Sequence, residues 1–373
     1  MLGIFVKSEL RKAVEKVNDI IDKNSTSQIL RNVYIKFEDD KAVFIGTDAN
    51  IQVQVTVEGN IQENGEVTVN CNDFYMIIKN LSDETVTLKK SDNVFEIIGE
   101  DSNFGLPTID PEEFIFLEFP EPVGELKIAA SNLHYGFKKT STLAAQNIRT
   151  AVSPDFVSVL VERNSNLLTI GSTDTNILGV VDIPQDEIEI PEKLRFLFPL
   201  KAVKVLEKVL SDEESVTLRY TKNKVLISAG KFSYIVSLLD SDSYIDLKVL
   251  FEKEVKYEVK LNKNELDLKL KPIVHIIDAE QSCLHVQFDG EVFSVEGYNS
   301  PNKAVVKIKP IDSNKEEFDV YLNSNNLMKI LNSISSEEIT FQMTPDKKMV
   351  FLMPVIKSEI KEGYIIATIN FEI

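Results

Sequence analysis

The sequence predicts an α+β fold built from three copies of one domain-sized unit, because one strand–turn–strand pattern recurs at regular intervals. The copies are Val43–Val55, Leu167–Val181 and a more divergent Val292–Ile308. The turn residues Thr47 and Thr173 are 126 positions apart, and Tyr298 follows Thr173 by 125 positions. This spacing is the length of a small domain. The predicted domains are residues 1–122, 123–250 and 251–373.

Each third of the chain also contains two segments with helical periodicity. In the first of them Leu10, Val14, Val17 and Ile21 recur at steps of three and four residues, which places them on one face of a helix. A hairpin is expected after it, where apolar runs flank residues 38–41. The six expected helices are 7–23, 72–81, 131–144 with a trailing loop to 149, 199–210, 262–277 and 323–334.

Proline affects two of these helices differently. Pro199 opens the fourth helix, where a missing N–H removes no hydrogen bond. Pro272 lies inside the fifth helix, so we expect it to break or kink that helix.

Composition predicts an intracellular protein that does not enter the membrane. The chain has 373 residues, 43% of them hydrophobic, and no apolar run approaches the roughly 18 residues of a membrane-spanning helix. The first residues also lack the apolar core of a signal peptide. Cys71 and Cys283 lie in different thirds of the chain, which makes a disulfide framework improbable and favours a reducing cytoplasm.

The sequence has no pattern typical of catalysis, metal binding or cofactor binding. His134, His275 and His285 have no metal-ligand spacing, and His285 alternates with apolar residues as on the outer face of a strand. There is no glycine-rich phosphate loop, dinucleotide fingerprint or nucleophile elbow. We therefore predict no catalytic residue, no metal and no cofactor.

Charge is distributed unequally between helices and the rest of the chain. The six expected helices, with the trailing loop of the third, carry a net charge of +8, while the whole chain carries −18, so the remainder carries −26. Such a distribution attracts phosphate to the helices and repels it elsewhere. Twelve helices from two chains, packed about 10 Å apart, would enclose roughly 28 Å of clear space. We therefore expect a ring with helices lining a bore wide enough for duplex DNA.

Several short segments, in order and at the right spacing, give the chain a resemblance to the bacterial DNA polymerase III β subunit family, the sliding clamps. They are Gln28–Asn32, Gly46–Asp48, Phe104–Leu106 with Leu117, Ala145–Arg149, Ser172–Asp174 with Leu178, and Leu238–Asp240 with Tyr244–Asp246. The resemblance covers essentially the whole chain at low identity. It implies three clamp-type domains in a head-to-tail ring homodimer that encircles duplex DNA without reading its sequence. It also implies a cytoplasmic processivity factor that tethers DNA polymerase and is opened by a clamp loader.

The resemblance and the helix charges together give the expected DNA-facing residues. The family touches DNA at the positions of Asn24, Gln146, Arg149 and Lys201, although Asn24 replaces a basic residue. The helices add eight cations: Arg11, Lys12, Lys16, Lys23, Lys138, Lys139, Lys204 and Lys208.

The resemblance also places a groove for short apolar peptide motifs of the polymerase and loader between the second and third domains. Its expected residues are Val152, Thr173, Thr175, Asn176, Ile177, Leu178, Tyr244, Ile245, Ile366, Ala367, Thr368 and Ile369. At the dimer interface, Phe104 and Leu106 are expected to meet Ile276 and Ile277 of the other subunit.

The groove departs from the family pattern at three places. The family's Gly-His-Arg is replaced at 175–177, its Pro by Ile245, and its Met-Pro-Met by 367–369. The site thus stays apolar but loses polar groups, as in a divergent or second clamp copy.

Two other functions compete with the clamp. A paralogue could keep the ring and bind only proteins, and reversing the charge of Lys138, Lys139, Arg149 and Lys201 would then have no effect. A hydrolase or transferase would instead require titratable groups gathered in a pocket.

Overall fold

The protein has an α+β fold, in agreement with the sequence, and every described strand pair is antiparallel. The computed structural model describes residues 1–186, 193–211, 213–277, 282–299 and 302–369. Within these ranges the strands form sheets of 13, nine and four strands. The chain divides into two compact units: unit 1 is Met1–His134 with Lys204–Leu238, and unit 2 is Tyr135–Val203 with Leu239–Ile373.

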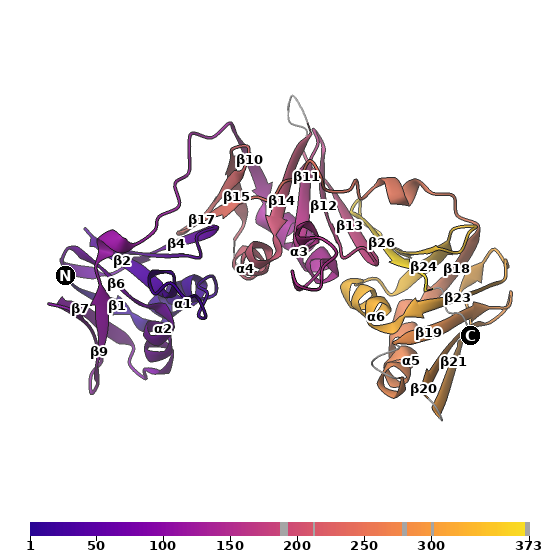
Figure 1. The fold of residues 1–373 in the computed structure, drawn as a ribbon, viewed down its shortest axis with the longest axis horizontal. Helices are drawn as coiled ribbons and strands as arrows, with labels where there is room; N and C mark the ends of the chain where they lie inside the picture. Colours follow the sequence, from indigo (N-terminus) through magenta and orange to yellow (C-terminus); the bar gives the residue numbers. More distant parts are fainter. Residues whose placement is uncertain (187–192, 212, 278–281, 300–301, 370–373) are drawn as a thin grey trace. The chain divides into compact units, whose positions relative to one another are not determined.

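Unit 1 contains the 13-stranded sheet, in the order β10-β15-β16-β17-β4-β3-β2-β6-β9-β8-β7-β1-β5. Two helices, α1 (Lys7–Asn18) and α2 (Cys71–Asn80), lie side by side against it (Figure 1). Its strands are β1 Leu2–Val6, β2 Asn32–Glu38, β3 Lys41–Thr47, β4 Ile51–Glu58, β5 Asn60–Glu63, β6 Gly65–Asn70, β7 Thr85–Ser91, β8 Val94–Ile98, β9 Asn103–Ile109, β10 Gly124–Ala129, β15 Ser215–Tyr220, β16 Lys224–Ala229 and β17 Phe232–Ser237.

Unit 2 contains a nine-stranded sheet, β14-β11-β12-β13-β26-β25-β24-β18-β22, and a four-stranded sheet, β21-β20-β19-β23. Helices α5 (Lys263–Ile276) and α6 (Ser324–Ser333) pack together in it. Its strands are β11 Ser158–Arg163, β12 Leu167–Thr173, β13 Ile177–Pro184, β14 Leu194–Pro199, β18 Tyr257–Asn262, β19 Cys283–Phe288, β20 Phe293–Asn299, β21 Asn302–Ile308, β22 Asp312–Ser313, β23 Phe318–Asn323, β24 Glu338–Met343, β25 Met349–Pro354 and β26 Lys361–Ala367.

Two of the three boundaries between the units fall inside helices α3 (Ala130–Thr140) and α4 (Leu200–Leu210), and the third lies between Leu238 and Leu239, after β17. Short 3₁₀ helices complete the elements: η1 Ile29–Arg31, η2 Pro111–Glu113, η3 Ser141–Leu143, η4 Pro154–Phe156 and η5 Val249–Glu252. The division into three domains at residues 122 and 250 stays a prediction.

All six predicted helices are present, and three of them differ from the prediction in detail. Helix α3 ends at Thr140, four residues before its predicted end, and η3 follows it. Helix α1 ends at Asn18 and a turn follows, so Lys23 and Asn24 lie in the loop behind the helix. The expected break at Pro272 is wrong, because α5 continues through that residue to Ile276. Pro272 cannot donate to the carbonyl of Leu268, and Leu268 is 69% exposed, so water can satisfy that carbonyl.

The recurring turn has the same hydrogen bonds in its first two copies. Thr47 Oγ1 donates to the carbonyl of Ile51 at 2.9 Å, and Asp48 Oδ1 accepts from the Ile51 N–H at 2.9 Å. Thr173 Oγ1 donates to Ile177 at 2.6 Å, and Asp174 accepts from Ile177 at 2.9 Å. The Thr-Asp pair is therefore a side-chain cap that closes a hairpin. Residues 300 and 301 of the third copy lie outside the described residues.

The third residue of each of these turns has a left-handed backbone: φ is 74° at Ala49 and 81° at Thr175. A β-branched residue is strained there, whereas glycine is not. We expect Thr175→Gly to raise the free energy of unfolding by about 1 kcal/mol, since a left-handed L-residue costs roughly 1–2 kcal/mol. Urea unfolding of the full chain measures this. Thr175→Val keeps the β-branch and should give no gain; a gain of equal size there, or a loss in the glycine variant, contradicts the strain.

Candidate functional site

The structure brings several predicted DNA-facing cations together in unit 1, where α1 and the last two turns of α4 lie side by side. Lys12, Lys16 and Lys208 line one pocket of about 350 Å³ with two carboxylates of α1 and its C-cap, Glu15 and Asp19. Amphipathic helices create this surface: the apolar residues of α1 are buried, while Arg11 and Lys12 on the opposite face are exposed. The residues gathered here match a sequence-based expectation, and their contact with DNA stays a proposal.

Helix α4 carries a stripe of lysines. Lys201, Lys204 and Lys208 are all exposed and follow one another at steps of three and four residues, so they share one helix face. The opposite face is packed in the core, with Ala202, Val203, Val205, Leu206, Val209 and Leu210 buried. Packing of the apolar face therefore fixes the direction in which the lysines point.

Carboxylates partly neutralise the cations of unit 1. Lys208 Nζ lies 2.8 Å from Asp19 Oδ2, and Lys12 Nζ lies 3.6 Å from Glu9 Oε1. Lys16 Nζ instead lies 5.7 Å from the centre of the Phe232 ring. These exposed pairs are weak in water, so a phosphate can compete with the carboxylates for the same ammonium groups.

Some of the expected DNA-facing residues of unit 2 are exposed, and others form hydrogen bonds within the chain. Lys138 and Arg149 are exposed, as are Lys23 and Asn24 of unit 1. The Gln146 side chain is exposed, but its amide nitrogen donates to the carbonyls of Ser141 and Ala144 at 3.1 and 2.7 Å, so it caps the η3 turn.

Lys139 corrects the prediction, because its side chain is buried and cannot face DNA. Its Nζ lies 3.5 Å from Glu362 Oε1 and donates at 2.7 Å to both the Ser333 carbonyl and Ser335 Oγ. The Glu362 side chain is 1% exposed, and it also accepts from the hydroxyls of Tyr135 and Tyr364. Burial lowers the pKa of Lys139, while the adjacent carboxylate opposes that shift.

Two residues of the expected peptide groove belong to an apolar cluster on one face of the nine-stranded sheet. Leu178 and Tyr244 belong to this cluster, which we call the groove cluster. Its other buried members are Leu160, Val180, Leu197, Leu247, Phe351 and Ile365, with Phe156, Leu239, Leu250, Phe251, Met349 and Met353 packed around them. Thr173 pairs with Leu178 across the strands and so shares its face.

Ile177 and Ile366 correct the predicted groove, because they lie on the opposite face of the sheet. They pair with each other between β13 and β26, and both are buried in the separate core that α5 and α6 cover. Leu178 pairs with Ile365, so Ile365 is the residue of β26 that joins the groove cluster. A shift of one residue along a strand reverses the face.

The remaining expected groove residues lie at or near the surface. Val152 is 79% exposed and Ile245 is 39% exposed, while Thr175 and Asn176 form the exposed tip of the β12–β13 hairpin. The segment 367–369 is half-buried, with the Ile369 N–H donating to the Tyr321 carbonyl. Burial raises the pKa of Tyr244 to about 12, so this residue contributes as an uncharged ring.

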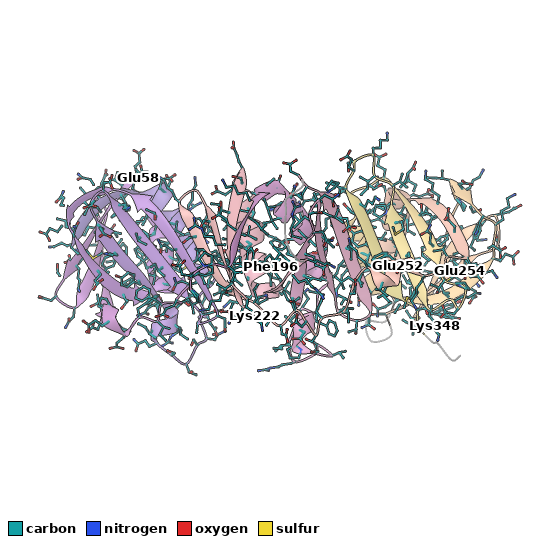
Figure 2. The ribbon with its side chains drawn as sticks, turned by 90° about the horizontal axis from the view of Figure 1, so that it is seen from above. Glu58, Phe196, Lys222, Glu252, Glu254 and Lys348 are labelled. Carbon is teal, nitrogen blue, oxygen red and sulfur yellow. The ribbon has the colours of Figure 1, made fainter. Side chains whose placement is uncertain are left out.

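A pocket of about 250 Å³ extends this sheet face beyond Val180, with Phe251 and Met353 as apolar walls. Asp182 and Lys248 also line the pocket, and Lys248 Nζ lies 2.9 Å from Asp182 Oδ1. Glu252, the last residue of η5, is a third charged lining residue and is labelled in Figure 2. The apolar face of unit 2 thus has a charged border.

Of the four predicted interface residues, two are exposed and two are buried. Phe104 on β9 is 41% exposed and Ile276 at the end of α5 is 37% exposed, so both present apolar surface. Leu106 and Ile277 are each 8% exposed, so their side chains offer a partner little surface.

The sequence analysis missed the strand edges. Among the strands that the structure describes, residues 103–107 of β9 pair only with β8, and β21 forms one edge of the four-stranded sheet. Each edge leaves backbone groups that another strand can pair.

The described residues contain no candidate metal site. Three or more His, Cys, Asp or Glu side chains that could hold a metal ion are not found together in those ranges. His285 pairs with Asp319 at 2.7 Å and stacks on Tyr321. The described helices include none long and apolar enough to cross a membrane.

Comparisons with known proteins agree with this geometry. Residues 4–118 match the family model of the DNA polymerase III beta subunit, N-terminal domain. The beta sliding clamp of Staphylococcus epidermidis is 25% identical over 91% of this chain and 93% of its own length.

Solved structures share the fold over the full chain. A sliding clamp from Pseudomonas aeruginosa bound to griselimycin has a TM-score of 0.92 at 18% identity, with all of both chains covered. A Helicobacter pylori beta clamp bound to a DNA ligase peptide has a TM-score of 0.85 at 19% identity, covering 99% of this chain and 100% of its own.

Proposed function

We propose, from the premise that this chain belongs to the DNA polymerase III β subunit family, that it is a DNA sliding clamp. Two copies close head to tail into a ring around duplex DNA and tether a DNA polymerase as a processivity factor. The observation that carries this proposal is the exposed lysine stripe of α4 beside the cations of α1, in a chain whose net charge is −18. Cations confined to helix faces attract phosphate there, while the acidic remainder repels it.

Binding of this kind is independent of base sequence. Lysine and arginine contacts to phosphates position a protein on DNA and carry no sequence information directly. The ring then supplies retention and the cations supply only a weak, mobile attraction, so the clamp can slide. The proposed role involves no catalytic residue, metal or cofactor, and it places the protein in the cytoplasm with the DNA.

The exposed strand edges support a head-to-tail dimer. β9 belongs to unit 1 and β21 to unit 2, so the two edges differ and suit a heterologous contact that closes a ring. Phe104 and Ile276 would add apolar contact beside the paired strands. Strand pairing across such edges is a common mode of association.

The groove cluster supports capture of short apolar peptide motifs from the polymerase and the clamp loader. Such a motif would place apolar side chains against the partly exposed members of the cluster, among them Phe156, Phe251 and Met353. The exposed Ile245, which follows Tyr244 of the cluster, would add a further apolar contact. The relative from Helicobacter pylori was solved with a DNA ligase peptide, which provides a suitable probe.

Retention on DNA tests the ring directly. The purified protein, loaded on circular plasmid by a clamp loader, should stay bound through gel filtration and should be lost when the plasmid is cut once. Light scattering should give twice the mass of the 42.1 kDa chain. Equal release from circular and linear DNA, or a stable monomer at working concentration, contradicts the proposal.

Substitution at the groove tests peptide capture separately. Ile245→Glu should weaken binding of the fluorescent DNA ligase peptide by about tenfold or more, because it places a charge where an apolar anchor would be buried. Val355→Glu is the matched control, since Val355 of unit 2 is 41% exposed and Ile245 is 39% exposed. The control should bind normally. Equal binding by both variants would place the peptide elsewhere.

A further inference from the structure

A second apolar surface lies in unit 1, on the segment Phe114–Leu117, which we call the strap. Phe114 is buried against Tyr34 and Ile45 and fixes the segment to the sheet. The next two residues remain at the surface: Ile115 is 43% exposed and Phe116 is 47% exposed. The Phe116 ring lies 5.0 Å from that of Tyr34 and 4.9 Å from that of Phe114. Two adjacent large apolar side chains are thus exposed.

The strap is held in place at both ends. Before it, Asp110 caps η2 by accepting from the Glu112 N–H at 3.0 Å, and the Phe114 N–H donates to the Pro111 carbonyl. After it, the Leu117 N–H donates to Gln52 Oε1 at 2.8 Å, and Lys224 Nζ donates to the carbonyl of Glu118 at 2.6 Å. A surface fixed in advance loses little conformational entropy when a partner binds.

Carboxylates flank the strap on both sides in the sequence. The segment 110–122 contains no lysine or arginine, and its five acids are all exposed: Asp110, Glu112, Glu113, Glu118 and Glu121. Two lysines on the neighbouring strands already have partners, because Lys36 Nζ lies 3.0 Å from Glu38 and Lys224 donates to the carbonyl of Glu118. The strap therefore combines an apolar centre with an anionic border.

We infer that the strap is a docking surface for a basic amphipathic segment of a partner protein. The apolar side chains of that segment would cover Ile115 and Phe116, and its lysines or arginines would pair with the surrounding glutamates. Exposed apolar patches with a polar border are typical of protein interfaces, and complementary charge selects the partner.

The charge of the strap argues against other occupants. Five carboxylates repel nucleic acid and anionic lipid. The strap lies in unit 1, whereas the groove cluster lies in unit 2, so this inference adds a second docking surface to the proposed clamp.

A pair of synthetic peptides tests the strap. One is an amphipathic helical peptide of leucine and lysine carrying a fluorophore, and the other has every lysine replaced by glutamate. Fluorescence anisotropy with the full chain should show binding of the cationic peptide only. Ile115→Ser with Phe116→Ser should weaken that binding about tenfold or more, the loss expected of central apolar anchors. Replacing the four glutamates by glutamine should flatten its salt dependence.

Ile311→Ser with Val355→Ser is the matched control, because these residues of unit 2 are 50% and 41% exposed. The control should bind the peptide as the parent does, and circular dichroism should show both variants folded. Any of three binding results would overturn the inference: equal binding of both peptides, equal loss in the strap and control variants, or loss caused instead by Ile245→Glu. A change in oligomeric mass confined to the strap variant would also overturn it, since the occupant would then be a second copy.

Discussion

Charge reversal of four exposed cations, Lys138→Glu, Arg149→Glu, Lys201→Glu and Lys204→Glu, should abolish retention of the protein on circular DNA. All four side chains are exposed on α3, α4 or the loop after η3. Each phosphate contact that is lost reduces the magnitude of the slope of log affinity against log salt by about 1. The loss of four contacts should therefore reduce it by about 3 to 4. The four new carboxylates add repulsion. Loading on nicked plasmid over a series of salt concentrations measures both effects.

The matched control reverses four exposed lysines outside the helices: Lys222, Lys253, Lys348 and Lys357. Figure 2 labels Lys222 and Lys348. The change in net charge is the same in both variants, so a difference between them reports position and not total charge. The control should keep its retention on DNA. Equal loss in both variants would mean that only net charge matters, and equal retention would favour a protein-binding scaffold.

The repeated architecture could be predicted from the sequence because local rules determine it. The turn at Thr47 and Thr173 is closed by side chains within four residues, so the same letters give the same geometry wherever they occur. The helix faces follow from the periodicity of buried residues, which is why the lysine stripe of α4 is where spacing predicts it.

The strand faces could not be predicted from resemblance alone. Ile177 and Leu178 are adjacent, and which of them faces the groove depends on the register of β13 with β26, a strand about 190 residues away in sequence. Choosing Ile366 instead of Ile365 is the same error by one residue. Residue type gave no help, because all four residues are aliphatic.

Lys139 was assigned to the wrong environment for a related reason. Lys138 and Lys139 are neighbours of one type at the end of α3, and 100° of helix rotation separates an exposed side chain from a buried one. The partners of Lys139 are distant in sequence: Ser333 follows it by 194 positions. Only the tertiary structure brings such groups together.

The buried pair of Lys139 and Glu362 should be the most sensitive polar contact to single substitution. Lys139→Met leaves the Glu362 carboxylate in the interior with two tyrosine hydroxyls and no cation. Removing one member of a buried ion pair costs about 3–5 kcal/mol, because the remaining charge is neither hydrated nor neutralised. Urea unfolding of the full chain, followed by circular dichroism, should show a correspondingly lower midpoint.

Adding Glu362→Gln to Lys139→Met should recover most of the loss. Glutamine is close in size to glutamate and carries no charge. Its oxygen can accept from one of the two tyrosine hydroxyls, and its amide N–H can donate to the oxygen of the other. The interaction energy in the double-mutant cycle should then reach roughly 2–3 kcal/mol, the upper range for residues in one network. Lys138→Met is the control. Lys138 is the neighbour of Lys139 on α3 and is exposed, so its substitution should change stability by less than about 0.5 kcal/mol. If the two single lysine variants unfold at the same urea concentration, the charge on Lys139 does not stabilise the interior, and the buried network must be held by its tyrosine hydroxyls alone.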